Sequence, residues 1–254
     1  MSLNAAVSIE NAWLDYHGLT VFEDFSWKVP SGSFTAVIGP SGCGKSTLLR
    51  VVAGLEPVNA GKLACLENDE RGQHDIAMAF QSPTLLPWLT VEQNAFLPFD
   101  LTGTAVDSAI RARFDRLLSL VGLDDFRHAR PHALSGGMQM RAALIRTFIT
   151  NSRLVLMDEP FAALDELTRE RLGAELEKLW REEQPAVVFV THNLSEAVML
   201  ADRVCVLSSR PVRIVREIEV QLPRPRTYDT RFLPRYEAVL NQVRQCLLDA
   251  ESMV

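Results

Sequence analysis

The chain has 254 residues, enough for one large α/β domain or two small ones. Its apolar fraction of 47% is ordinary for a globular protein, and no run reaches the roughly 18 apolar residues of a membrane span. The N-terminus lacks the basic and apolar regions of a secretory signal, and a net charge of −6 without a basic stripe argues against a nucleic-acid partner. We therefore expect a cytoplasmic protein, unless a partner holds it at a membrane.

The first predicted elements are two strands and a helix. Apolar residues at 7, 9 and 12–14 predict an N-terminal strand, followed by a turn at 16–18. Residues 34–38 form a short apolar run that reads as a buried strand ending in Gly39-Pro40. Residues 46–53 look helical and stop at Gly54, a glycine suited to the position after a helix. The order is strand, glycine-rich loop and helix.

The loop matches the phosphate-binding pattern G-x-x-x-x-G-K-[ST]. Glycines let consecutive backbone N–H groups curl around an anion, and the following helix points its positive end at the phosphates. Lys45 is expected to reach the β- and γ-phosphates, and Ser46 to offer its hydroxyl to Mg²⁺. The residues expected to bind nucleotide are Gly39, Pro40, Ser41, Gly42, Cys43, Gly44, Lys45, Ser46 and Thr47.

The middle of the chain predicts a helical insertion in a mostly parallel sheet. Residues 110–120 and 138–149 look helical, and we assign about 87–149 to the insertion. Residues 134–139 precede the second of these helices; Ser135 is a good N-cap, and Gly136 and Gly137 expose backbone N–H groups. This is a second anion-binding helix start in a chain that already has one.

Two more apolar runs, 154–157 and 187–190, predict buried parallel strands with an amphipathic helix between them. The first run ends in two acids, where a parallel sheet delivers residues to its ligand crevice. Asp158 is placed to hold Mg²⁺, and Glu159 to polarise an attacking water. At the end of the chain, one apolar stripe predicts a final amphipathic helix that packs on the core or on a partner: Tyr236, Val239, Leu240, Val243, Leu247 and Leu248.

Taken together, these motifs resemble the ABC-type ATPase family over nearly the whole chain. The resemblance adds the glutamine Gln81, a D-loop at residues 162–165 and the switch histidine His192. It implies an aromatic residue that stacks on adenine; Tyr16 matches best, with Trp13 and Phe22 as competitors. It also implies a P-loop NTPase (RecA-like) α/β fold, with N-terminal antiparallel strands and the helical subdomain.

The resemblance further implies one ATPase domain spanning the chain. Its core would cover about 1–86 and 150–215, and a C-terminal strand and helix about 216–254. Two copies would pack head to tail, so that each ATP on one P-loop meets Ser135, Gly136 and Gly137 of the other copy. Glu159, His192, Lys45 and Gln81 would act in hydrolysis, and Ser46, Gln81 and Asp158 would hold Mg²⁺.

Residues 81–91 and 210–226 are similar to the nitrate, sulfonate, taurine and pyrimidine-precursor importers. This implies a membrane permease as partner, an indirect partnership with a solute-binding protein and a place at the cytoplasmic side of the membrane. The sequence departs from the pattern at Met140, Ala162 and Asn193, and residues 63–74 are shorter and more polar than usual.

Two alternatives stay open at this point. One is a regulatory ABC protein that dimerises on ATP without a permease. The other is a P-loop kinase, which would give no role to residues 134–139.

Overall fold

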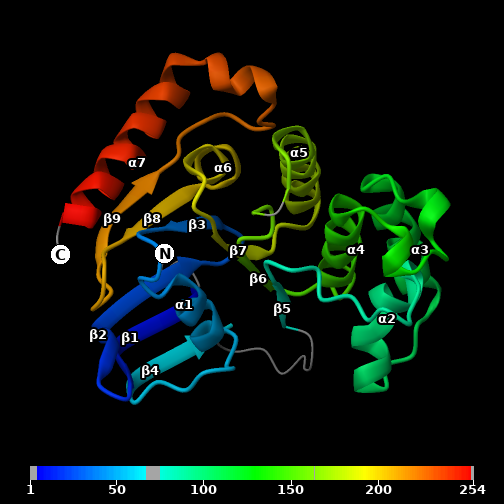
Figure 1. Ribbon diagram of the computed structural model, residues 1–254, viewed down its shortest axis with the longest axis horizontal. Coiled ribbons are helices and arrows are strands. Elements are labelled where there is room, and N and C mark those ends of the chain that lie inside the picture. The colour runs from blue at the N-terminus through cyan, green and yellow to red at the C-terminus, as the bar shows by residue number, and fades with distance from the viewer. Residues whose placement is uncertain (1–4, 67–74, 163, 253–254) are drawn as a thin grey trace.

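A computed structural model describes residues 5–66, 75–162 and 164–252 of the chain (Figure 1). Its N-terminal sheet has the order β2-β1-β4 and is antiparallel. The strands are β1 (Ala5–Tyr16), β2 (Leu19–Pro30) and β4 (Ala60–Cys65). The predicted N-terminal strand and the turn after Tyr16 are confirmed, because β1 and β2 form a hairpin at this point.

The second sheet has the order β5-β6-β7-β3-β8-β9, and every neighbouring pair is parallel except β8 and β9. The predicted mostly parallel sheet is therefore confirmed. Its strands are β3 (Phe34–Ile38), β5 (Ile76–Ala79), β6 (Leu154–Asp158), β7 (Ala186–Val190), β8 (Arg203–Leu207) and β9 (Ile214–Glu219).

Both faces of this sheet are covered, which explains why its strands read as continuous apolar runs. In β6, Leu154 and Leu156 belong to one buried cluster, whereas Val155 and Met157 belong to the other. Helix α1 (Lys45–Val52) packs in the first cluster, between the two sheets (Figure 1). The loop before α1 therefore sits between two rigid layers.

The opposite face carries α5 (Glu166–Glu183), α6 (Leu194–Leu200) and α7 (Pro234–Ser252) (Figure 1). The final helix is confirmed, but Leu248 does not share the core-facing side of its apolar stripe, since it is 53% exposed. The buried positions of α7 include Cys246 and Ala250. Leu248 follows Cys246 by two residues, which is about 200° of rotation in an α-helix, and so faces the other way.

The insertion lies between β5 and β6 and contains α2 (Val91–Thr102), α3 (Ser108–Leu120) and α4 (Gly136–Phe148). Each helix begins at a residue whose side chain accepts a bond from the first turn: Thr90, Asp107 and Ser135. Such caps satisfy N–H groups that have no partner within the helix. The exact limits of the subdomain stay a prediction.

Short 3₁₀ segments complete the fold at Asp124–Phe126, Pro131–Ala133 and Tyr228–Phe232. None of the helices in the described ranges is long and apolar enough to cross a membrane. Residues 67–74 of the unusual segment 63–74 lie outside the described residues, and so does Ala163 of the D-loop segment.

Candidate functional site

The glycine-rich loop lies tightly against the strands around it. Gly44 has a φ of 129°, and a Cβ there would come within 2.9 Å of Val21 Cγ1. A Cβ at Gly39 would come within 2.9 Å of the Leu207 carbonyl oxygen. Contacts this short with a strand side chain and a backbone atom cannot relax easily. Glycine is required at both positions by close approach, and at Gly44 by backbone conformation as well.

The start of α1 is suited to an anion. No described side chain caps this helix, and its first turn carries no acidic residue. Backbone N–H groups at a helix start carry partial positive charge and bind phosphate readily. The Lys45 ammonium lies within the loop and donates to the carbonyl oxygens of Gly39 at 2.8 Å and Pro40 at 2.9 Å. An ammonium has three protons, so it has one donor beyond these two bonds.

Ser46 and Asp158 meet at the edge of the loop. The Ser46 hydroxyl donates to Asp158 Oδ1 at 3.0 Å, although the two residues are 112 positions apart in sequence. Burial raises the pKa of Asp158; the hydrogen bond from Ser46 lowers it, and the charge of Glu159 raises it again. A hydroxyl and a half-buried carboxylate beside a phosphate loop fit Mg²⁺, which prefers a few oxygen ligands completed by phosphate and water.

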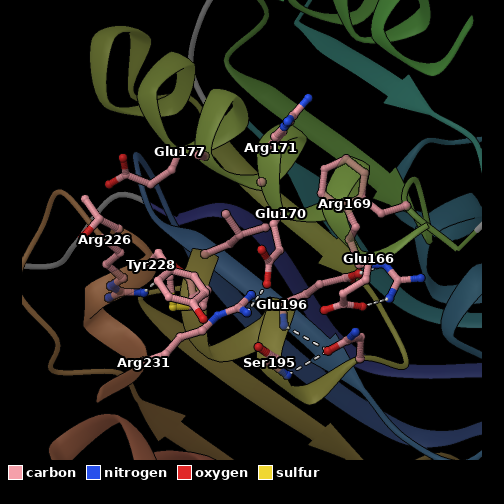
Figure 2. Close-up of a pocket in the computed structure, with 17 residues that line it drawn as sticks. Glu166, Arg169, Glu170, Arg171, Glu177, Ser195, Glu196, Arg226, Tyr228 and Arg231 are labelled. Carbon is pink, nitrogen blue, oxygen red and sulfur yellow. Dashed lines mark hydrogen bonds and ion pairs between the residues drawn. The ribbon is translucent and has the colours of Figure 1, made fainter. Parts of the chain in front are cut away.

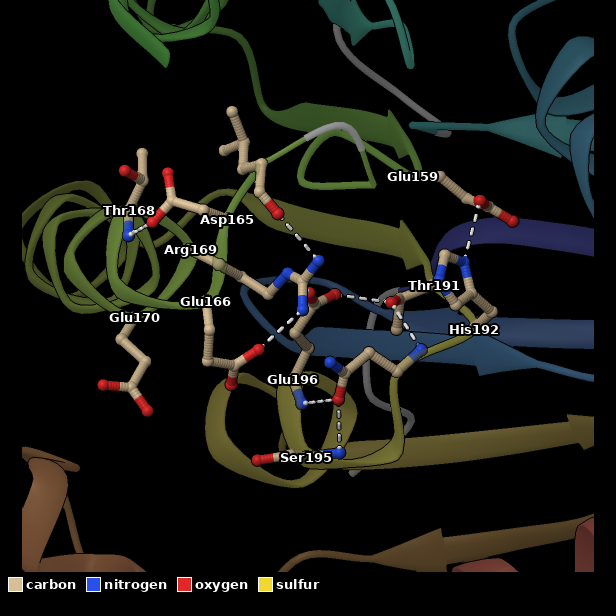
Figure 3. A network of polar contacts seen from close by, with 12 residues as sticks. Glu159, Asp165, Glu166, Thr168, Arg169, Glu170, Thr191, His192, Ser195 and Glu196 are labelled. Atoms are coloured by element: carbon tan, nitrogen blue, oxygen red, sulfur yellow. Dashed lines mark hydrogen bonds and ion pairs between the residues drawn. The ribbon is translucent and has the colours of Figure 1, made fainter.

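Glu159 and His192 form a second contact, shown in Figure 3. His192 Nδ1 lies 2.9 Å from Glu159 Oε2. Glu159 has a φ of 46°, which is strained for a residue with a side chain. Its N–H donates to the Val190 carbonyl at 2.9 Å, and its carbonyl accepts from Ala162 at 3.1 Å. These bonds hold the strained residue at the end of β6, beside the end of β7 that carries His192.

A cavity of about 410 Å³ joins the loop to one of the candidate aromatic residues. Tyr16 lines it, as do Lys45 and Glu159. Phe22 is fully buried and stacks on Phe25 with ring centroids 5.0 Å apart, so it cannot reach a ligand. Trp13 is 43% exposed and does not line this cavity. Among the three aromatic candidates, Tyr16 alone faces the space next to the loop.

Two predicted groups are not brought to this cavity within the single chain. Ser135, Gly136 and Gly137 begin α4 in the insertion, and none of them is among the described residues that line it. A Cβ at Gly136 would meet nothing within 4 Å, so this helix start is open beside Gly136, whereas a Cβ at Gly137 would come within 3.0 Å of Thr168 Cγ2. Gln81 is exposed beyond the end of β5 and likewise does not line the cavity. The starts of α1 and α4 are thus separate in the chain, and only residues at the first of them are among the described residues that line this cavity.

Arg210 is a residue of the cavity that sequence reasoning missed. Its guanidinium Nε donates to the Gly42 carbonyl at 2.7 Å, and Nη2 also contacts that oxygen. Arg210 lies 168 residues after Gly42, in the turn between β8 and β9. No local pattern marks it, because only the pairing of β3 with β8 brings that turn to the loop.

The comparisons with known proteins settle the family. A family model described as ABC transporter matches residues 22–162, more than half of the chain. This chain belongs to the ABC transporter family. It is similar to an ATP-binding protein of Brucella abortus biovar 1, with 40% identity over 240 residues, 93% of this chain and 91% of that protein.

Two further likenesses concern function and fold. The aliphatic sulfonates import ATP-binding protein SsuB 1 of Mesorhizobium japonicum is 42% identical over 220 residues, 87% of this chain and 81% of that protein. A dimeric post-hydrolysis structure of the ATP-binding cassette MJ0796, bound to ADP and Pi, superposes with a TM-score of 0.73 at 28% identity. It covers 85% of this chain and 99% of the cassette. The ABC cassette fold and the ABC transporter ATPase activity predicted from the sequence are confirmed.

Proposed function

We propose that this ABC ATPase powers an importer, working through a membrane permease at the cytoplasmic side of the membrane. The solute belongs to the nitrate, sulfonate and taurine class, and an organosulfonate fits best. The likeness to SsuB 1, whose printed name assigns it to aliphatic sulfonate import, supports this class. A solute-binding protein would reach the ATPase only through the permease.

The observation that carries the proposal is the single cavity shared by Tyr16, the phosphate loop and Glu159. ATP would stack its adenine on Tyr16 and place its phosphates on the start of α1. Lys45 would turn its free donor to the β- and γ-phosphates. Ser46 and Asp158 would hold Mg²⁺, with Gln81 approaching from β5. Mg²⁺ bound there would neutralise charge that develops on the phosphate oxygens.

Hydrolysis is an in-line attack of water on the γ-phosphate. Glu159 would accept the proton of the attacking water as the general base. His192, which contacts the Glu159 carboxylate, would orient that water and donate to the γ-phosphate. Lys45 and the backbone N–H groups of the loop would stabilise the charge that spreads over the phosphate oxygens.

A second copy of the chain would complete the site. Its Ser135, Gly136 and Gly137 would bind the γ-phosphate from the opposite side in a head-to-tail dimer. The open space in front of Gly136 supports this arrangement. So does the likeness to the MJ0796 cassette, whose structure is dimeric with ADP and Pi.

The loop after Gln81 is the proposed permease contact. Trp88 is 64% exposed. The backbone around it is fixed by the buried side chain of Asn94, which bonds the N–H of Leu86 at 2.7 Å and the carbonyl of Thr90 at 2.9 Å. Arg146 donates to the Thr84 carbonyl at 2.9 Å. A rigid loop that presents an exposed tryptophan suits a groove for a permease helix.

The test uses the native host and a Glu159→Gln variant. The tagged wild-type chain should copurify with a polytopic membrane protein and restore sulfonate uptake in a deletion strain. Glu159→Gln should keep its partner, hydrolyse ATP at least about a hundredfold more slowly, accumulate as an ATP-bound dimer and restore no uptake. A chain that remains without a membrane partner contradicts the importer assignment. Restored uptake of nitrate but not sulfonate contradicts the solute, and wild-type hydrolysis by the variant contradicts Glu159 as base.

A further inference from the structure

Arg169, in the first turn of α5, contacts its own helix and two other segments of the chain (Figure 3). Its Nη2 donates to the Leu164 carbonyl at 2.9 Å, and Nη1 donates to Glu166 Oε2 at 2.8 Å. Its Nε lies 3.1 Å from Glu196 Oε1 of α6, which makes the two side chains an ion pair, although this Nε donates no hydrogen bond to any described residue. One guanidinium thus ties the segment after Glu159 to the helix after His192. The planar fork of arginine is suited to holding several acceptors in fixed directions.

From Glu196 the contacts continue to the segment that carries His192. The Thr191 hydroxyl donates to Glu196 Oε2, and it accepts from the Asn193 N–H at 3.0 Å. Asn193 Oδ1 in turn accepts from the N–H groups of Ser195 at 2.9 Å and Glu196 at 3.2 Å, and so caps α6. His192 lies between Thr191 and Asn193, and both of these neighbours are held from the Glu196 side.

We propose that Arg169 and Glu196 are positioning residues that hold His192 against Glu159 for hydrolysis. The proposal deepens, and rests on, the roles proposed above for those two residues. Neither Arg169 nor Glu196 lines the cavity next to the phosphate loop. They act by fixing the two backbone segments whose side chains meet at 2.9 Å between His192 Nδ1 and Glu159 Oε2. Small displacements of a positioned group cost large factors in rate.

The surroundings of Arg169 make the proposal testable. Beyond Arg169 and Glu196 lies a cavity of about 250 Å³ between α5, α6 and the segment before α7 (Figure 2). Its rim includes the exposed side chains of Arg171 and Tyr228, so the cavity opens to solvent. Shortening Arg169 therefore enlarges an existing space that water can enter, instead of leaving a void in a packed core.

The experiment compares steady-state ATP hydrolysis by the full chain and its variants. Arg169→Ala should lower kcat roughly ten- to hundredfold and change the KM for ATP less than about twofold. Glu196→Gln, which keeps the shape but loses the charge that faces Arg169, should lower kcat by a smaller factor. The double variant should be no slower than Arg169→Ala alone, because both substitutions break one chain of contacts.

The decisive comparison is between His192→Ala and the double variant that also carries Arg169→Ala. The second substitution should lower kcat by less than about twofold more, because His192 is already absent. Arg181→Ala, an exposed arginine of the same helix, is the matched control and should leave kcat and KM unchanged. Unchanged kcat in Arg169→Ala, or a full multiplicative loss in the His192→Ala background, overturns the positioning role. A joint loss of kcat, ATP affinity and thermal stability overturns it too, since that is the mark of general damage.

The same variants distinguish failure of the positioning role of Arg169 from failure of the hydrolytic roles of Glu159 and His192. If Glu159→Gln and His192→Ala each lower kcat strongly while Arg169→Ala hydrolyses ATP at the wild-type rate, the positioning role alone fails. If Glu159→Gln or His192→Ala hydrolyses ATP at the wild-type rate, the proposed hydrolytic role of that residue fails.

Discussion

Asp158 shows how a residue can be arranged for a ligand at a cost to the free protein. Its carboxylate is half-buried and accepts one hydrogen bond, from Ser46. The neighbouring Glu159 adds a like charge, and burial is the main reason that the pKa of Asp158 is raised. A pKa above the unfolded value means that folding disfavours the charged form. A cation bound beside the carboxylate would offset the unfavourable burial of its charge and its repulsion from Glu159.

The pH dependence follows from that direction. The contribution of Asp158 to stability is most favourable below the ordinary pKa of an aspartate, and it is lost as pH rises through the raised pKa. Asp158→Asn should therefore raise the melting temperature of the nucleotide-free protein at pH 7, and the gain should shrink as pH falls toward about 4. It should abolish the extra stabilisation that Mg²⁺-ATP gives the wild type. Thermal unfolding across pH, with and without Mg²⁺-ATP, measures both effects.

Asp165→Asn is the control for this series. A hydrogen bond from Thr168 lowers the pKa of the Asp165 carboxyl, the opposite direction from Asp158. Its substitution should give no gain in melting temperature at pH 7. A wild-type protein more stable than Asp158→Asn at neutral pH without nucleotide would contradict the burial argument.

At the scale of an element, the start of α4 combines a structural role with an open face. The Ser135 hydroxyl accepts from the Met138 N–H at 3.3 Å and so caps the helix. Gln139 fixes the turn before it by donating to the carbonyls of Pro131 at 3.0 Å and Leu134 at 3.3 Å. Gly136 leaves the end of the helix uncovered. The helix start is thus held in place, with open space beside Gly136 and the Thr168 side chain beside Gly137.

Ser135→Asp separates these two roles. Aspartate caps a helix about as well as serine, so unfolding stability should stay within about 0.5 kcal/mol of the wild type. ATP binding to the monomer should be unchanged, because the P-loop is untouched. The added charge would face the γ-phosphate of the other copy, so ATP-driven dimerisation should be lost and hydrolysis should fall at least about tenfold.

Ser135→Asn is the matched control, since asparagine caps equally well without the charge. With Mg²⁺-ATP, a larger fraction of Ser135→Asn than of Ser135→Asp should be dimeric, as measured by the molar mass from light scattering. Equal dimerisation by the aspartate variant and the wild type would refute a shared site at this helix start.

At the scale of the whole molecule, two arginines attach the segment before α7 to the face of the six-stranded sheet that carries α5 and α6. Arg226 is buried and donates to the carbonyls of Val198 at 3.0 Å, Ala201 at 2.7 Å and Val220 at 3.2 Å. Burial lowers the pKa of Arg226 to about 10, which still leaves it charged at neutral pH. The guanidinium carbon of Arg224 lies over the Trp180 ring, 4.2 Å from the ring centroid. The two arginines join the segment before α7 to α6 and to the end of β9.

Arg226→Ala should destabilise the protein by about 2–4 kcal/mol, because several buried carbonyls lose their donor at once. Arg235→Ala, on the exposed side of α7, should change stability by less than about 0.5 kcal/mol. Urea unfolding of the nucleotide-free chain measures both values. A loss below about 1 kcal/mol for Arg226→Ala would mean that water replaces the guanidinium.

Short-range patterns predicted much of this fold. Residues 34–38 were expected as a strand, and β3 has those limits. Gly54 ends α1 with a φ of 71°, as a glycine after a helix should. Leu248 was misplaced because six apolar residues were counted as one stripe, although only some of them share a face of α7. Apolar residues on exposed faces are common, so apolarity by itself does not fix orientation.

The sequence by itself determined the phosphate loop, the acidic strand end and the second helix start, because each is a local pattern whose chemistry depends on neighbours a few residues away. Only the tertiary structure decided that Tyr16 and not Phe22 faces the cavity, that Arg210 reaches Gly42, and that Arg169 contacts both the segment after Glu159 and helix α6. Those contacts join residues on different strands and helices. Their distances depend on strand order and helix packing, which no local pattern encodes.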